Sequence, residues 1–98
     1  GTATTKIISS TSATKSILLC HLSLGLSAAA DLTILEGTGT NCGTNTVSKS
    51  GAYKTVLAVA LDLPPPATVI QFTAGRDVCL TLTGTTIAGG LAIYAELP

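Results

Sequence analysis

The sequence predicts an all-β protein: a single small β-sandwich, jelly-roll-like, with roughly six to eight short antiparallel strands. Three observations predict it. Apolar residues alternate with a period of two, turn-forming Gly, Pro, Asn and Ser separate these runs, and the abundant Thr, Val, Ile and Leu suit a pleated surface. The length of 98 residues supports one domain, which we divide into a flexible N-terminal arm, residues 1–14, and a β-sandwich domain, residues 15–98.

The arm is polar apart from a short apolar stretch at Ile7 and Ile8, which is expected to form a short edge strand. Such a segment could reach onto a neighbouring molecule, or it could simply be a frayed terminus. Both interpretations stay open at this point.

The clearest signal runs from Ser16 to Gly37 and predicts a hairpin. Its first arm, Ser16–Leu24, has a wholly apolar face that is expected to meet the core: Leu18, Cys20, Leu22 and Leu24. The opposite face carries Ile17, Leu19, His21 and Ser23. Gly25–Asp31 is expected to form the turn, and Leu32–Glu36 the returning arm. A helix through Leu24–Leu35 is the alternative, which the β-branched residues that follow disfavour.

Five further segments are expected downstream of the hairpin. Gly37–Gly51 is polar and lacks periodicity, so it predicts a surface loop. Val56–Leu63 is almost continuously apolar and predicts a strand that is buried on both faces or packed in an interface, ended by Pro64–Pro66. The remaining expected strands are Thr68–Thr73, Val78–Thr83 (with Val78, Leu80 and Leu82 on one side) and Ile87–Leu97, the last with a bulge or a close backbone approach at Gly89-Gly90.

The composition excludes several function classes. Charged residues make up 10% of the chain and balance to zero, which argues against a nucleic-acid groove or a basic membrane-binding patch. Hydrophobic residues make up 46%, but aromatics only 3%, so the core has to be aliphatic and few rings can stack on bases or sugars. So few charges protect poorly against self-association, which favours a protein that works inside an assembly.

The cysteines predict a disulfide better than a metal site. Zinc is disfavoured because the chain has no C-x₂-C pair, and because Cys20 and His21 are adjacent on an expected strand and point to opposite faces. A bridge from Cys42 would hold the polar loop, with Cys79 as the favoured partner and Cys20 as the alternative. Three reduced thiols remain equally compatible with the sequence.

No motif predicts catalysis. The single histidine, His21, has no adjacent nucleophile motif, and Gly37-Thr38-Gly39 is too short for a phosphate-binding fingerprint. The carboxylates are scattered along the chain: Asp31, Glu36, Asp62, Asp77 and Glu96. The sequence therefore predicts no enzyme, no catalytic residue, no metal and no cofactor.

Three segments carry a family resemblance: EGTGTNC (Glu36–Cys42), GRDVCL (Gly75–Leu80) and GGLAIYAEL (Gly89–Leu97). With them the chain resembles small structural proteins of tailed bacteriophages and prophages over roughly Ser16–Leu97, departing from the pattern at Lys49–Ala67. The resemblance implies a decoration (cement) protein on the outer capsid surface of the virion. Its partner would be the major capsid protein, and it would form a homo-oligomer, with a trimer favoured, and bind no nucleic acid or membrane.

The expected contact surface combines the arm, the apolar run and the last strand. The candidate interface residues are Ile7, Ile8, Val56, Leu57, Val59, Leu61, Ile93 and Tyr94. Two other functions stay open: a subunit of a phage tail, fibre or extracellular filament, and a carbohydrate-binding module. A carbohydrate-binding module is disfavoured because it would have only three aromatics to stack on a sugar: Tyr53, Phe72 and Tyr94.

Overall fold

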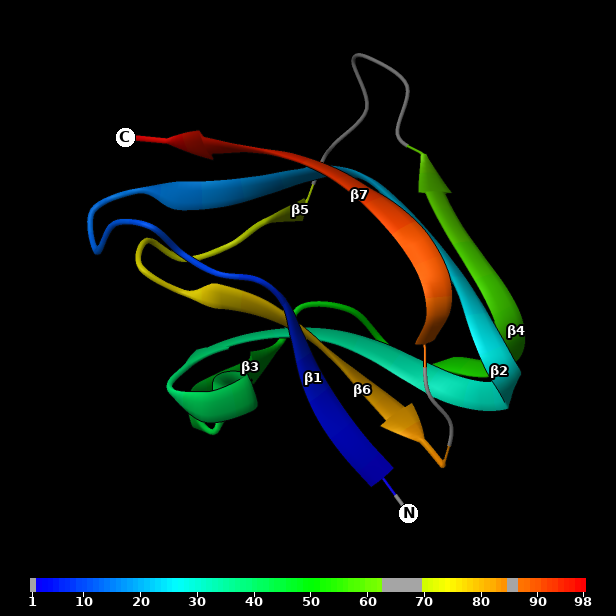
Figure 1. The fold of residues 1–98 in the computed structure, drawn as a ribbon. Helices are drawn as coiled ribbons and strands as arrows, with labels where there is room; N and C mark the ends of the chain where they lie inside the picture. Colours follow the sequence, from blue (N-terminus) through cyan, green and yellow to red (C-terminus); the bar gives the residue numbers. More distant parts are fainter. Residues whose placement is uncertain (1, 63–69, 85–86) are drawn as a thin grey trace.

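The all-β class is confirmed. A computed structural model describes residues 2–62, 70–84 and 87–98, and in these ranges the strands pair antiparallel in a single curled sheet (Figure 1). The elements are β1 (Thr2–Ile8), β2 (Ser16–Thr38), the 3₁₀ helix η1 (Thr40–Cys42), β3 (Thr44–Ser48), β4 (Tyr53–Asp62), β5 (Ile70–Gln71), β6 (Asp77–Thr83) and β7 (Ile87–Leu97). The proline break at Pro64–Pro66 and the start of the strand expected at Thr68–Thr73 lie outside the described residues.

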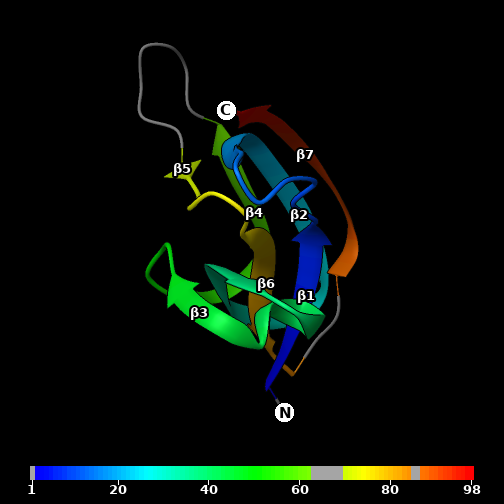
Figure 2. The same ribbon diagram turned by 90° about the vertical axis from the view of Figure 1, so that its left-hand side faces the viewer.

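The long strand β2 organises the sheet, because every described strand except β1 pairs with it. Residues 16–26 of β2 pair with β7 along one edge and with β5 and β4 along the other. Residues 32–38 pair with β6 and β3, and β1 lies beyond β6. We call β7, β4, β5 and residues 16–26 the aliphatic half, and β1, β6, β3 and residues 32–38 the cross-linked half. The two views in Figures 1 and 2 show how β2 bends to bring the halves face to face.

The predicted hairpin is wrong, because its two arms are parts of one continuous strand and pair with other strands. At Gly25–Asp31 β2 bends sharply and runs back across the molecule (Figure 1), but its two arms do not pair with each other, and the register with β4 shifts between Gly25 and Ala30. The small side chains in this stretch permit a sharp bend, and a bulge is the usual way for a strand to bend. The alternative of a helix through Leu24–Leu35 is also wrong.

The predicted core face of β2 is correct for only half of the first arm. Leu22 and Leu24 are buried, but Leu18 and Cys20 are half-buried, and Ile17 and Leu19 are buried in their place. The register with β7 shifts between Leu19 and His21, so Cys20 is an extra residue in the strand. One extra residue reverses the alternation of side chains, because that alternation has a period of two.

Both halves contribute to one hydrophobic core, as expected if they pack on each other. The aliphatic half supplies Ile17, Leu19, Leu22, Leu24 and Leu26, and the rest of the cluster is Ile8, Ala30, Leu32, Ile34, Phe72, Val78, Leu80 and Leu82. Val78, Leu80 and Leu82, which the sequence places on one side of their strand, are all buried in this core. Burial between two facing halves is compatible with the predicted sandwich.

Residues 2–8 contain the edge strand that the sequence predicted around Ile7 and Ile8. They form β1, which pairs with β6 from Thr2 opposite Thr83 to Ile8 opposite Val78. Beyond β1, the backbone N–H and the hydroxyl of Thr11 donate to the Glu96 carboxylate at the end of β7. The segment is thus an edge strand followed by a loop that is tied to the sheet.

Two downstream expectations also need correction. The polar stretch Gly37–Gly51 is not simply a loop: it contains η1 and β3, and β3 pairs with β2. The apolar run that forms most of β4 is not buried on both faces, since Leu57 is 59% exposed. In both segments, pairing with β2 determines the secondary structure and burial, and the local polarity of the sequence does not predict them.

Candidate assembly surface

Strand β7 carries most of the large apolar side chains that reach the surface. Among the described residues, the exposed large hydrophobic side chains are Val47, Leu57, Leu91, Ile93, Tyr94 and Leu97. The last four belong to β7. A cluster of apolar side chains on one strand is a stronger indication of an interaction site than single exposed residues.

The outer edge of β7 is unprotected. Within the described part of the chain β7 pairs only with β2, and Figure 2 shows it along the right-hand margin of the molecule. From Ile87 to Ala95 the strand has no charged residue and no proline. Charged residues and prolines are the usual devices that stop an edge strand from pairing with another chain, so this edge is open to pairing.

The register with β2 shows which side of the sheet each β7 residue faces, because directly opposed residues share a face. Ala92 lies opposite the buried Leu22, and Tyr94 lies opposite the buried Leu19, so both face the core side. Leu91, Ile93 and Leu97 alternate with them and form a row on the outer side of the sheet. We call these three residues the outer row.

Gly90 explains how β7 lies so close to β2. A Cβ atom at this position would lie 2.4 Å from the carbonyl oxygen of Ser23 and 2.7 Å from Cδ2 of Leu24. Only glycine fits such a close approach without displacing its neighbours. The close backbone approach expected at Gly89-Gly90 is therefore confirmed.

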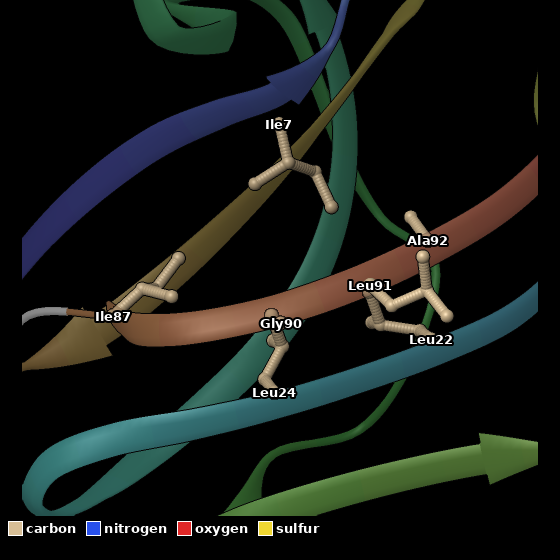
Figure 3. A pocket seen from close by; sticks show the side chains of 7 residues that line it. All are labelled: Ile7, Leu22, Leu24, Ile87, Gly90, Leu91 and Ala92. Carbon is tan, nitrogen blue, oxygen red and sulfur yellow. The ribbon is translucent and has the colours of Figure 1, made fainter.

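A pocket of about 210 Å³ lies between β1 and β7, where the two halves of the sheet leave a gap (Figure 3). Its lining is wholly apolar: Ile7, Leu22, Leu24, Ile87, Gly90, Leu91 and Ala92. In Figure 3 Ile7 projects from β1 toward the space beside β7. Since no titratable side chain lines it, the pocket is suited to an apolar or aromatic group and offers no acid or base for chemistry.

The predicted interface residues divide into three groups. Leu57, Ile93 and Tyr94 are exposed, and Ile7 lines the pocket. Ile8 is buried in the core and is not available to a partner, and Val56 is half-buried against the same core. Val59 and Leu61 have side chains outside the described part of the structure. Leu91 and Leu97 were missed, although their spacing from Ile93 along the expected last strand could have identified them.

Cys42 and Cys79 form a disulfide, the pairing that the sequence favoured, with a Cα–Cα distance of 6.3 Å. Both residues are buried and pack with Leu35, so the bridge fastens η1 to β6 inside the cross-linked half. Cys20 is a free, half-buried thiol. No group of three or more His, Cys, Asp or Glu side chains that could hold a metal ion occurs within residues 2–62, 70–84 and 87–98.

The two buried carboxylates, Glu36 and Asp77, accept hydrogen bonds from the protein's own backbone. Glu36, 3% exposed, accepts the N–H of Thr73 at 2.9 Å, and its Oε1 lies 3.7 Å from Nζ of Lys49. Asp77 accepts the N–H of Ser10 at 2.7 Å. These contacts tie loops to strands, which is a structural role.

Asp31 lies at the end of the bend in β2. It accepts the N–H of Thr55 at 2.9 Å and the ammonium of Lys54 at 3.2 Å. These contacts, with the Thr55 hydrogen bond the larger, lower the pKa of the Asp31 carboxyl from its usual value of 3.8. The carboxylate thus joins the bend of β2 to the first residues of β4.

Aromatic side chains do not form one platform for a sugar. Phe72 is buried in the core, Tyr53 packs partly against that core, and Tyr94 is exposed on β7. Comparison of the chain with protein-family models, with curated proteins and with solved structures finds no match. In the described ranges, no helix is both long and apolar enough to cross a membrane.

Proposed function

We propose that the chain is a structural component of a virus particle, a decoration (cement) protein that binds the outer surface of the capsid and stabilises it. The proposal assigns it the major capsid protein as partner, homo-oligomeric assembly and no catalytic activity. The observation that carries it is the contrast between one half, held together by a disulfide and ion pairs, and the other half, whose uncharged outer row is exposed. The likeness of Glu36–Cys42, Gly75–Leu80 and Gly89–Leu97 to phage structural proteins also supports it.

The outer row suits this role because its side chains stand on a rigid sheet. Leu91 and Leu97 are 58% and 41% exposed, so a partner can remove much of their surface from water. Full burial of one leucine side chain stabilises a complex by about 1.5–3 kcal/mol, and a few such residues give useful affinity. Rigid backbone pairing beneath them keeps the entropic cost of binding low.

Binding to empty capsids tests the proposal. Purified protein is mixed with capsids assembled from the major capsid protein of the same virus, and bound copies are counted after sedimentation. We expect saturable binding and a higher temperature of capsid disruption. Leu97→Ser is expected to weaken binding about tenfold or more, while Val47→Ser, at an exposed apolar site on β3, leaves it unchanged. Absence of binding to immature and to mature capsids contradicts the proposal.

A filament or tail subunit is the second candidate, and one observation favours it. Within the described residues β4 also pairs only with β2, and its Leu57 is exposed. The aliphatic half therefore has open edges on both sides, and head-to-tail contact between β7 and β4 would not close by itself. Light scattering that shows mass increasing without limit as concentration rises would support this function over the first.

A further inference from the structure

The unpaired edge of β7 is complementary to a second copy of itself. Antiparallel pairing of two identical edges places a two-fold axis perpendicular to the sheet, which is the symmetry of most protein dimers. Paired residues must then lie on the same face of the joined sheet. This condition requires the axis to pass through a residue position and not between two residues, which leaves few possible registers.

The register centred on Ala92 matches side chains on both faces. On the outer face it places Leu91 opposite Ile93 of the second copy, so two exposed aliphatic side chains cover each other. On the core side it places Tyr94 opposite Gly90, a pairing in which a ring covers the backbone of an edge glycine. Glu96 falls opposite Ala88, so no like charges meet.

Neighbouring registers match less well. An axis through Ile93 places the Glu96 carboxylate opposite Gly90, beside a wholly apolar pocket, which costs the desolvation of a charge. An axis through Leu91 places Tyr94 opposite Ala88 and leaves the pocket beside Gly90 uncovered. The side chains on both faces of the joined sheet therefore favour the register whose two-fold axis passes through Ala92.

In the register centred on Ala92, the pocket between β1 and β7 is covered by Tyr94 of the second copy. Gly90 lines the pocket, and Tyr94 of the second copy stands directly opposite Gly90 and on the same face. At about 210 Å³ the pocket exceeds the roughly 150 Å³ of an apolar cavity that accommodates benzene. In the single chain Tyr94 is 48% exposed, so its ring has surface to bury there.

We propose that two copies of this chain join by antiparallel pairing of their β7 edges about Ala92, with Tyr94 of each copy covering the pocket beside Gly90 of the other. The aliphatic halves then form one continuous sheet, and the outer rows of both copies lie side by side on its exposed face. The formation of this dimer does not depend on the proposed function. Only the idea that the dimer is the unit that binds a capsid rests on the proposed function.

Sedimentation equilibrium of the purified, disulfide-intact chain tests the contact. We expect a dimer, and we expect Tyr94→Ala to raise its dissociation constant at least tenfold, because aromatic side chains in central pockets dominate such interfaces. Leu57→Ala, at an exposed site on the other edge of the aliphatic half, is the matched control and leaves the dimer unchanged. Unchanged circular dichroism shows that each variant is folded.

Thiol cross-linking tests the register. In a Cys20→Ser background, Ala92→Cys places two thiols on directly opposed residues, whose Cβ atoms lie about 4.5–5.5 Å apart. Ala95→Cys is the control, because its two copies are offset along the strands by about 20 Å. A short bis-maleimide is expected to link the first variant and not the second. If Ala92→Cys does not fold, the effect of Tyr94→Ala on the dissociation constant decides the proposal.

Several outcomes overturn this inference. They are a monomer at all concentrations, a closed trimer, cross-linking of Ala95→Cys as efficient as that of Ala92→Cys, or a dimer weakened by Leu57→Ala and not by Tyr94→Ala. None of these measurements uses capsids. A dimer that binds no capsid therefore contradicts the proposed function and not this inference. A monomer that binds capsids contradicts this inference and the homo-oligomeric part of the proposed function, but leaves capsid binding standing.

Discussion

The two halves of the sheet are stabilised by different means. In the cross-linked half, the Cys42–Cys79 disulfide joins η1 to β6, and Lys6 Nζ lies 3.5 Å from the Asp77 carboxylate. The hydroxyls of Thr4 and Thr81 also hydrogen-bond across β1 and β6 at 2.9 Å. Each of these contacts connects residues that are far apart in the sequence, so together they hold the half as one unit.

The aliphatic half depends on strand pairing with β2 and on the shared core. Its described surface carries the outer row, Tyr94 and Leu57, where the other half exposes only Val47 among large hydrophobic side chains. The comparison teaches that the internal restraints and the exposed apolar surface lie in different places. Such a protein can expose an apolar strand edge to a partner in one half, while the cross-links in the other half stabilise the fold.

Among changes that test this difference between the halves, removal of the disulfide is expected to lower the free energy of unfolding most. The bridge closes a loop with a sequence separation of 37, for which the chain-entropy relation gives about 4 kcal/mol of stabilisation. The double variant Cys42→Ala/Cys79→Ala should lose about that free energy of unfolding in urea denaturation. Cys20→Ser, in the other half, should change it by less than about 1 kcal/mol. Equal losses for the two variants would mean that the halves do not differ in this respect.

Glu36 is expected to give the second largest effect. Glu36→Ala leaves the Thr73 N–H without its acceptor and removes the partner of Lys49, which should cost about 1.5–3 kcal/mol. Glu36→Gln keeps an acceptor and should recover part of that loss. Glu96→Ala removes the exposed contacts to Thr11 at the end of β7 and should cost less than about 1 kcal/mol. The free energies are measured by urea denaturation in dilute solution.

Acid sensitivity at Asp31, where the halves meet, is expected to be the smallest effect. Its pKa is lowered in the folded protein by the Thr55 N–H and Lys54, so its contribution is fully present above the usual pKa of 3.8 that applies to the unfolded chain. That contribution is lost as the pH falls through the lower folded pKa. The difference in stability between the wild type and Asp31→Asn should therefore be constant near neutral pH and disappear in acid.

Thermal unfolding across this pH range measures the effect. Lys54→Gln removes the Lys54 ammonium and leaves the Thr55 hydrogen bond, so it should reproduce only part of the change. A difference between the wild type and Asp31→Asn that persists at the lowest pH would show that the carboxylate charge is not its source.

The features that depend on local pattern could be predicted from the sequence. Period-two alternation at Val78–Thr83 and at the last strand identified extended backbone. The apolar, aromatic-poor composition predicted an aliphatic core, and the glycine pair predicted a close backbone approach. These properties follow from neighbouring residues, because side chains alternate along any strand.

The pairing of the strands could not be predicted from local pattern and became clear only in the folded chain. Gly25–Asp31 suits either a turn or a bend, and the bend formed because β6 and β7, distant in sequence, pair with the two arms of β2. Thr2–Ile8 is polar enough for an arm, yet it pairs with β6. The bulge at Cys20 and the pocket between β1 and β7 arise from the same non-local pairing. Strand order depends on contacts across the whole chain, which a local pattern does not contain.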